Sequence, residues 1–137
     1  MKFEFNSLIA FIGAIASFAW GGYPLGIQIL VYFAIADYIT GMVSAAKAHE
    51  LSSKIGFFGI VKKMLMFLLC SVAFKIDGLI GASGLLFNGV IFWYVGNEGL
   101  SIIENSIEMG LKVPKKLKDA IDILLAEDED NNETQNY

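Results

Sequence analysis

The sequence predicts an all-α integral membrane protein with three transmembrane helices, a short N-terminal hydrophobic helix and a C-terminal amphipathic helix. Of its 137 residues, 55% are hydrophobic, and the mean hydropathy is +0.59. A soluble domain of this size would expose large apolar patches at that composition. Long apolar stretches recur, and lysines gather in the segments that flank them. The length leaves room for one compact membrane unit and none for a separate soluble catalytic domain.

The first apolar stretch, residues 7–20, predicts a short helix that ends before a turn at residues 21–24. At 1.5 Å per residue it covers about 21 Å, less than a hydrocarbon core of about 30 Å. We therefore expect it to lie at the interface, to re-enter the membrane, or to cross a thinned membrane as a fourth span. The side of the membrane that holds the N-terminus stays open.

Residues 25–46 predict the first full span, with Asp37 near its middle. Gly41 and Ser44 fall on the same helical face as Asp37, and small residues of this kind let membrane helices pack closely. Two interpretations remain open for this face. It is either a packing surface with one paired carboxylate or a surface that opens to water.

The segment 47–63 predicts a connection that contains four lysines, and the positive-inside rule places it in the cytoplasm. The second span is expected to begin between residues 57 and 64 and to end near Phe74, with Lys75 and Asp77 at the far surface. A short uncharged connection then leads to the third span. That span returns the chain to the cytoplasmic side, where further lysines follow.

The third span, residues 85–108, carries a polar stripe along one side. On a helical wheel its polar members fall within an arc of about 120°. They are Asn97, Glu98, Ser101, Glu104, Asn105 and Glu108. A carboxylate near the centre of a membrane costs about 2.5–3.5 kcal/mol on insertion scales, so the stripe should face a partner, a protein interior or water. Alternatively, Glu104 and Glu108 lie beyond the membrane boundary and Glu98 has a purely structural lysine partner.

Charged residues from the three spans are expected to meet at a similar depth. Asp37 and Glu98 each lie about 13 Å from the cytoplasmic end of their helix. Lys62 or Lys63 approaches from the same side on a long side chain. We therefore predict that Asp37 and Glu98 pair with Lys62 or Lys63, within one subunit or between subunits. Three short spans enclose too little space for a channel, so the stripe also predicts a homo-oligomer.

Beyond the third span, Pro114 is well placed to begin a helix, and the apolar residues that follow repeat at three and four residues. This pattern predicts an amphipathic helix against the membrane lipid at the cytoplasmic surface. Residues 127–137 are acidic and lack an apolar pattern, so we expect a disordered tail. The domain prediction is thus one membrane-embedded helical domain, 1–126, followed by the tail. The C-terminus and the 47–63 loop are expected to be cytoplasmic.

The sequence contains no pattern that supports enzyme chemistry. It has one cysteine and one histidine, no phosphate-cradling glycine loop and no nucleophile placed with a base. We therefore expect no catalytic residues, no cofactor, no metal and no nucleic-acid partner.

Several motifs together resemble the phage lysis and toxin-secretion holins of Gram-positive bacteria and their phages. The matching segments are Asp37-Tyr38-Ile39-Thr40-Gly41, Ser44-Ala45-Ala46-Lys47, Leu51-Ser52-Ser53-Lys54-Ile55-Gly56, Gly59-Ile60, Lys62-Lys63, Asn97-Glu98-Gly99-Leu100-Ser101-Ile102-Ile103-Glu104-Asn105, Gly110 and Val113-Pro114 with Leu117. The resemblance covers residues 34–125, in the order and spacing of that family.

The resemblance implies a small protein of the bacterial cytoplasmic membrane that accumulates, oligomerises and then opens the membrane. It further implies a functional partner, either an endolysin or a secreted toxin, with which direct contact is not required. It brings no catalytic residues. The matching polar residues become candidates for assembly or pore lining, namely Asp37, Lys54, Lys62, Lys63, Asn97, Glu98, Ser101, Glu104 and Asn105.

Two other functions fit the same residues. Asp37 and Glu98 are also suited to the path of a small cation or proton channel or transporter. The stripe also suits a partner helix in an antiholin or a structural membrane subunit that does not permeabilise. The size of the solutes that cross the membrane distinguishes these functions.

Overall fold

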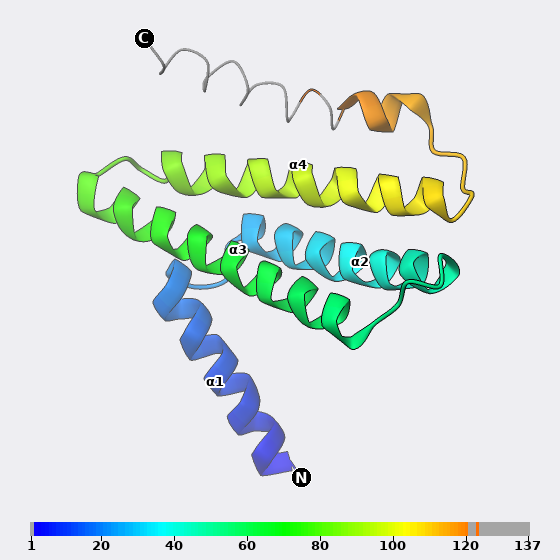
Figure 1. The fold of residues 1–137 in the computed structure, drawn as a ribbon. Coiled ribbons are helices and arrows are strands. Elements are labelled where there is room, and N and C mark those ends of the chain that lie inside the picture. The colour runs from blue at the N-terminus through cyan, green and yellow to red at the C-terminus, as the bar shows by residue number, and fades with distance from the viewer. Residues whose placement is uncertain (1, 121–122, 124–137) are drawn as a thin grey trace.

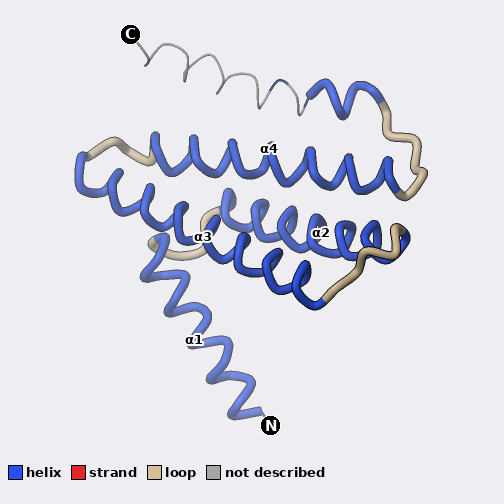
Figure 2. The backbone as a smooth tube through the Cα atoms, in the orientation of Figure 1, coloured by secondary structure: helices blue, strands red, loops and turns tan. Residues whose placement is uncertain are grey.

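The computed structural model describes residues 2–120 and residue 123. Its four main helices are α1 (Lys2–Trp20), α2 (Leu25–Lys47), α3 (Ser53–Ile80) and α4 (Leu85–Glu108). Helices α2 and α4 run side by side in the same direction. Helix α3 packs against both and runs in the opposite direction (Figure 1). The described residues form only helices and loops (Figure 2). The predicted all-helical architecture is confirmed.

The apolar core occupies one half of the bundle, near the turn between α3 and α4. Helix α2 contributes Ile27, Leu30 and Ala34, and the remaining buried members are Met66, Cys70, Phe87 and Ile91. Gly26 brings α2 close to α4, because a Cβ atom there would lie 3.0 Å from the Cδ1 atom of Ile91. The small residue thus permits a close helix contact of the kind common in membrane bundles.

Helix α3 is longer than the sequence predicted. The Ser52 side chain accepts a hydrogen bond from the Ile55 backbone N–H at 3.2 Å and caps its first turn. Gly81, at φ 68°, ends the helix in the left-handed conformation. The prediction of a connection at 47–63 was therefore wrong in extent, since residues 53–63 are helical and only 48–52 connect α2 to α3. The expected end near Phe74 was also wrong, because the helix runs on to Ile80.

Asp77 is buried and caps the following helix rather than marking an exposed surface. Its Oδ1 atom accepts a hydrogen bond from the Leu86 N–H at 3.1 Å, and its Oδ2 atom accepts one from the Phe87 N–H at 2.7 Å. These amides lie in the first turn of α4, where no intrahelical acceptor is available. A carboxylate is also favoured there by the helix dipole. Asp77 thus joins the end of α3 to the beginning of α4.

Helix α1 begins at Lys2, earlier than the predicted residue 7, and contacts the bundle only through its last turns. The Ser71 hydroxyl donates a hydrogen bond to the Ala19 carbonyl at 3.1 Å, and the Lys75 ammonium donates one to the Phe18 carbonyl. The Trp20 ring packs edge to face against Phe67. From there α1 runs obliquely away from the other helices (Figure 1). The side chains of its middle turns are almost all exposed and apolar.

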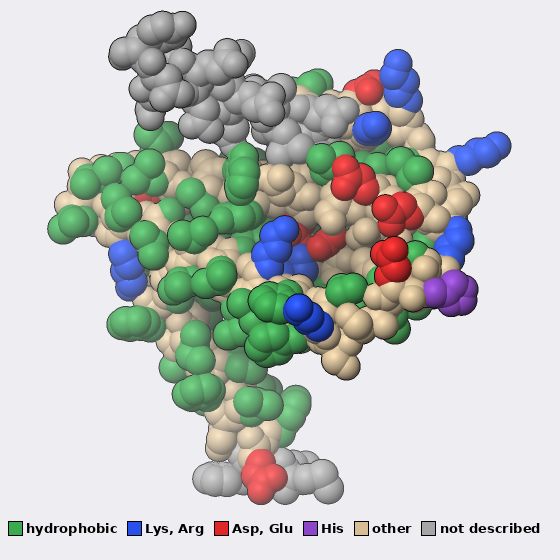
Figure 3. Space-filling view, in the orientation of Figure 1, with side chains coloured by type: hydrophobic (Ala, Val, Ile, Leu, Met, Phe, Trp, Pro, Cys, Tyr) green, Lys and Arg blue, Asp and Glu red, His purple; other side chains and the backbone are tan. Residues whose placement is uncertain are grey.

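Helices α2 and α3 are long and apolar enough to cross a membrane, and α1 contributes a shorter apolar helix. Helix α4 does not meet the same criterion, because its polar stripe lowers its hydropathy. Large apolar side chains cover much of the surface in Figure 3, whereas charged groups gather toward the end that carries Lys47. Three spans therefore stay a prediction, whereas two long apolar helices are observed.

Residues 115–120 are helical, in agreement with the start of the predicted amphipathic helix. Leu117 is exposed on it. The rest of that helix, apart from Ile123, and the predicted tail at 127–137 lie outside the described residues.

We expect Asp77→Ala to lower the free energy of unfolding by about 2 kcal/mol, because two backbone N–H groups of α4 lose their acceptor. The measurement is an unfolding titration in mixed detergent micelles followed by circular dichroism. Gly78→Ala is the matched control, since a Cβ atom there meets nothing within 4 Å. Equal stability of the two variants would contradict the capping role.

Candidate functional site

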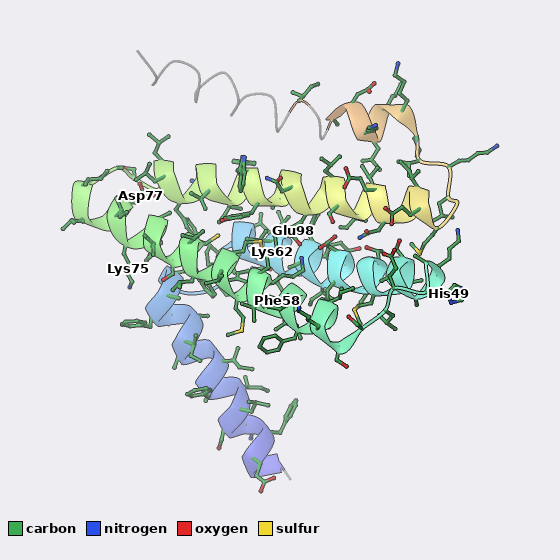
Figure 4. The ribbon with its side chains drawn as sticks, viewed as in Figure 1. His49, Phe58, Lys62, Lys75, Asp77 and Glu98 are labelled. Atoms are coloured by element: carbon green, nitrogen blue, oxygen red, sulfur yellow. The ribbon has the colours of Figure 1, made fainter. Side chains whose placement is uncertain are left out.

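Three charged side chains, one from each of the helices α2, α3 and α4, meet in the half of the bundle beyond the apolar core. The Lys63 Nζ atom lies 2.7 Å from Asp37 Oδ2 and also forms an ion pair with Glu98. The side chains of all three are 16% exposed or less. Figure 4 shows Glu98 between the ribbons of α3 and α4, with α2 behind. We call Asp37, Lys63 and Glu98 the charged triad.

Amide and hydroxyl groups satisfy the remaining oxygens of Asp37. The Asn105 Nδ2 atom donates hydrogen bonds to Asp37 Oδ1 at 3.2 Å and to Thr40 Oγ1 at 3.1 Å. The Thr40 hydroxyl in turn donates to the Asp37 carbonyl oxygen at 3.1 Å. Gly41 lies beside this contact, and a Cβ atom there would meet the Asn105 amide nitrogen at an ordinary van der Waals distance of 3.5 Å. Asn105, two turns after Glu98 on α4, therefore connects α4 to α2 at Asp37 and Thr40.

A second connection joins the ends of α2 and α4. The Ser44 hydroxyl donates a hydrogen bond of 2.5 Å to Glu108 Oε2, and the Lys47 ammonium donates one of 2.8 Å to the Glu108 carbonyl oxygen. Ser44 is buried. The pairing of α2 with α4 is thus apolar at one end and polar at the other.

The triad contains one cation and two carboxylates, and only Lys63 offsets the negative charge of the two carboxylates within it. Two carboxylates that face the same point repel each other, and low dielectric surroundings strengthen that repulsion. The lysine between them offsets it and satisfies both acceptors. Removing one member of a buried ion pair is usually far more destabilising than replacing the whole group by apolar residues.

An open groove of about 670 Å³ lies beside the triad, between α3 and α4, with α2 as its floor. Its polar lining includes the triad and further groups from α3 and α4, namely Lys62, Asn97, Ser101, Glu104 and Asn105. Apolar side chains of α3, together with Trp93 and Tyr94, complete its walls. The groove is therefore amphipathic.

The predicted stripe on α4 divides into two groups. Glu98, Asn105 and Glu108 reach the other helices, as described above. Asn97 donates to the Trp93 carbonyl oxygen of its own helix at 2.9 Å and, together with Ser101 and Glu104, lines the groove. Of the two candidate lysines, Lys63 forms the ion pairs and Lys62 is exposed at the groove.

Three contributors were not among the predicted site residues. Thr40 and Lys47 each lie three residues from a predicted member of the α2 face, Asp37 and Ser44 respectively. This spacing places both near that face and is the signal that could have found them. Asp77 lies seven residues after Cys70 on a buried face of α3, but only the tertiary structure brings it to the amides of α4.

Within the described residues, no three histidine, cysteine, aspartate or glutamate side chains gather as a metal site. The site is built from ion pairs, amides and hydroxyls between helices. It therefore holds α2, α3 and α4 together through polar contacts.

The chain belongs to the bacteriophage holin family, whose model matches residues 14–126. A protein of Bacillus phage phi105 named "probable holin" is 36% identical over 107 residues, covering 78% of this chain and 79% of the phage protein. The family resemblance inferred from the sequence motifs is thus confirmed.

Relatives also occur in bacterial genomes. An uncharacterised protein of Listeria innocua is 41% identical over 121 residues, covering 88% of this chain and 86% of its own length. Another, from Halalkalibacterium halodurans, is 37% identical over 120 residues, covering 84% and 89% respectively. No solved structure gives a significant match to this chain.

We expect Lys63→Met to lower the free energy of unfolding by about 3–5 kcal/mol, because it leaves Asp37 and Glu98 facing each other without a cation. Mixed-micelle unfolding titrations measure the change. Lys54→Met, at an exposed lysine of the same helix, should change stability by less than about 0.5 kcal/mol. Adding Asp37→Asn and Glu98→Gln to Lys63→Met should recover most of the lost stability. If stability is not recovered, repulsion between the two carboxylates is not the cause of the loss.

Proposed function

We propose that this protein is a holin that oligomerises in the bacterial cytoplasmic membrane and permeabilises it, releasing an endolysin or a large toxin. Family membership indicates a holin role and a non-enzymatic membrane protein. The charged triad is the structural observation that supports permeabilisation. It places three ionisable groups between helices that pack around an apolar core.

In the proposed membrane arrangement, α2, α3 and α4 span the bilayer. Positive-inside placement puts Lys47 and the lysines after α4 in the cytoplasm. The charged triad then lies about 15 Å from the cytoplasmic ends of α2 and α4, because Asp37 and Glu98 each lie ten residues before the end of their helix. The C-terminus and the 48–52 loop are cytoplasmic in this arrangement.

The contacts of the triad and Asn105 would stabilise a closed state of the holin. Within a single subunit they satisfy one another, so the polar face of α4 is partly turned inward toward α2 and α3. In an assembly of several subunits the same groups can instead face water along a shared opening. Exchange between these two arrangements needs no new residues. It needs only that the helices separate where the polar contacts now hold them.

The first test is controlled expression in a bacterial host, with membrane potential and viability followed over time, with and without a cytoplasmic endolysin. We expect an abrupt collapse of the potential and clearing of the culture only when the endolysin is present. A stable potential at high inserted levels would favour an inhibitor or structural subunit. Ion leakage without endolysin escape would favour a small channel.

If the contacts of Asn105 hold the closed arrangement, Asn105→Leu should advance lysis in that assay, because α4 loses its hydrogen bonds to Asp37 and Thr40. Asn88→Leu makes the same chemical change at an exposed position of α4 and should leave the lysis time unchanged. Membrane fractionation verifies equal insertion. An unchanged lysis time for Asn105→Leu at equal protein level would refute a gating role for this contact.

A further inference from the structure

The groove between α3 and α4 has oppositely charged side chains on its two walls. Lys62 lies on the α3 wall and Glu104 on the α4 wall, and both are exposed. Within the described part of the chain, neither forms an ion pair, in contrast to the neighbouring Lys63. The groove therefore presents one unneutralised charge of each sign to whatever lies outside it.

The position of Lys62 favours an oppositely charged partner. It lies nine residues after Ser53, about 13 Å along α3, and α3 is one of the two helices apolar enough to cross a membrane. A lysine at that depth is unfavourable unless it has a partner or reaches the surface along its stem. Glu104 lies four residues before the end of α4, about 6 Å from it. A Lys62 side chain that extends toward the cytoplasmic end approaches that level.

We propose that a second copy of this chain packs against the groove, with Lys62 of each copy paired to Glu104 of the other. The proposal rests on the proposed function and names the surface through which the holin assembles. A two-fold axis along the membrane normal keeps both copies at the same depth and brings the α3 wall of one opposite the α4 wall of the other. The two opposite charges thereby form two equivalent ion pairs.

Apolar side chains next to these charges provide the remaining contact. Leu65 and Leu69 on α3 are half or more exposed, and Trp93 on α4 is 40% exposed. All three line the groove. Aromatic and aliphatic groups around a desolvated ion pair are typical of the centre of an interface. The same surface thus has both the charge pattern and the packing side chains for self-association.

The test uses two full-length chains with different affinity tags, one carrying Lys62→Glu and the other Glu104→Lys. Each chain alone places like charges opposite each other at both sites of the proposed dimer. In a mixed dimer, one site pairs the two substituted side chains and the other pairs the two original ones, so both sites hold opposite charges. After co-expression, cross-linking in membranes and capture on one tag, we expect the mixed dimer to exceed either self-dimer by roughly tenfold or more.

The matched control is a pair of chains with Lys112→Glu and Glu50→Lys, which make the same charge changes at exposed positions away from the groove. These chains should associate with themselves and with each other equally, as the wild-type chain does. Membrane fractionation confirms that every variant is inserted, and association in the mixture shows that both variant chains still fold.

Three results would overturn the proposal. One is self-association of each single variant at the wild-type level. Another is recovery only in a chain that carries both reversals, without recovery in the mixture, because the pair would then lie within one chain. The third is unchanged association combined with loss of co-purifying phospholipid from both single variants, which would assign the groove to a lipid.

This assay requires neither permeabilisation nor an endolysin. If the variants form mixed dimers selectively but the wild-type chain never collapses the membrane potential, the interface is supported and the proposed function is contradicted. If lysis is normal but the variants show no preference for the mixed dimer, the proposed function is supported and the interface is contradicted.

Discussion

Lys63 connects three helices at a single point, and the polar half of the bundle depends on its charge. Its ammonium lies between Asp37 of α2 and Glu98 of α4, two carboxylates that would otherwise repel each other in surroundings of low dielectric. Without the lysine, α2 and α4 would be pushed apart at this level although their apolar ends pack well. With it, both carboxylates contribute to packing, and Asn105 can complete the contacts of Asp37.

The two halves of the bundle consequently serve different purposes. Around Leu30 and Cys70 the side chains are apolar and fully buried, and no rearrangement of charge can loosen them. Beyond Asp37 the contacts are ion pairs and hydrogen bonds, whose strength depends on water and on competing partners. The opening proposed for this protein would benefit from this division, because a holin must be stable before it opens. Separation of the helices would begin where water can replace the existing contacts.

The neighbouring residues Lys62 and Lys63 show how one helix can serve two contacts. They differ by about 100° around the axis of α3, so that Lys63 is partly buried and Lys62 is exposed, although both line the groove. Lys63 finds two carboxylate acceptors within its own chain. Among the described residues Lys62 forms no such ion pair, and Glu104 on the opposite wall is in the same position. Internal packing thus uses Lys63, whereas the proposed self-association would use Lys62, its neighbour in the sequence.

The sequence by itself determined the class of fold, the family and the charged residues that meet between the helices. Apolar stretches and lysine placement indicate membrane helices because the solvent preference of a side chain is a local property. The choice of Lys63 over Lys62 was decided only by the tertiary structure, because it depends on the rotation of α3 relative to α2 and α4. The same holds for Asp77, whose partners lie across a turn on α4. Helix rotation and long-range capping arise from packing between segments, and local residue patterns do not contain that information.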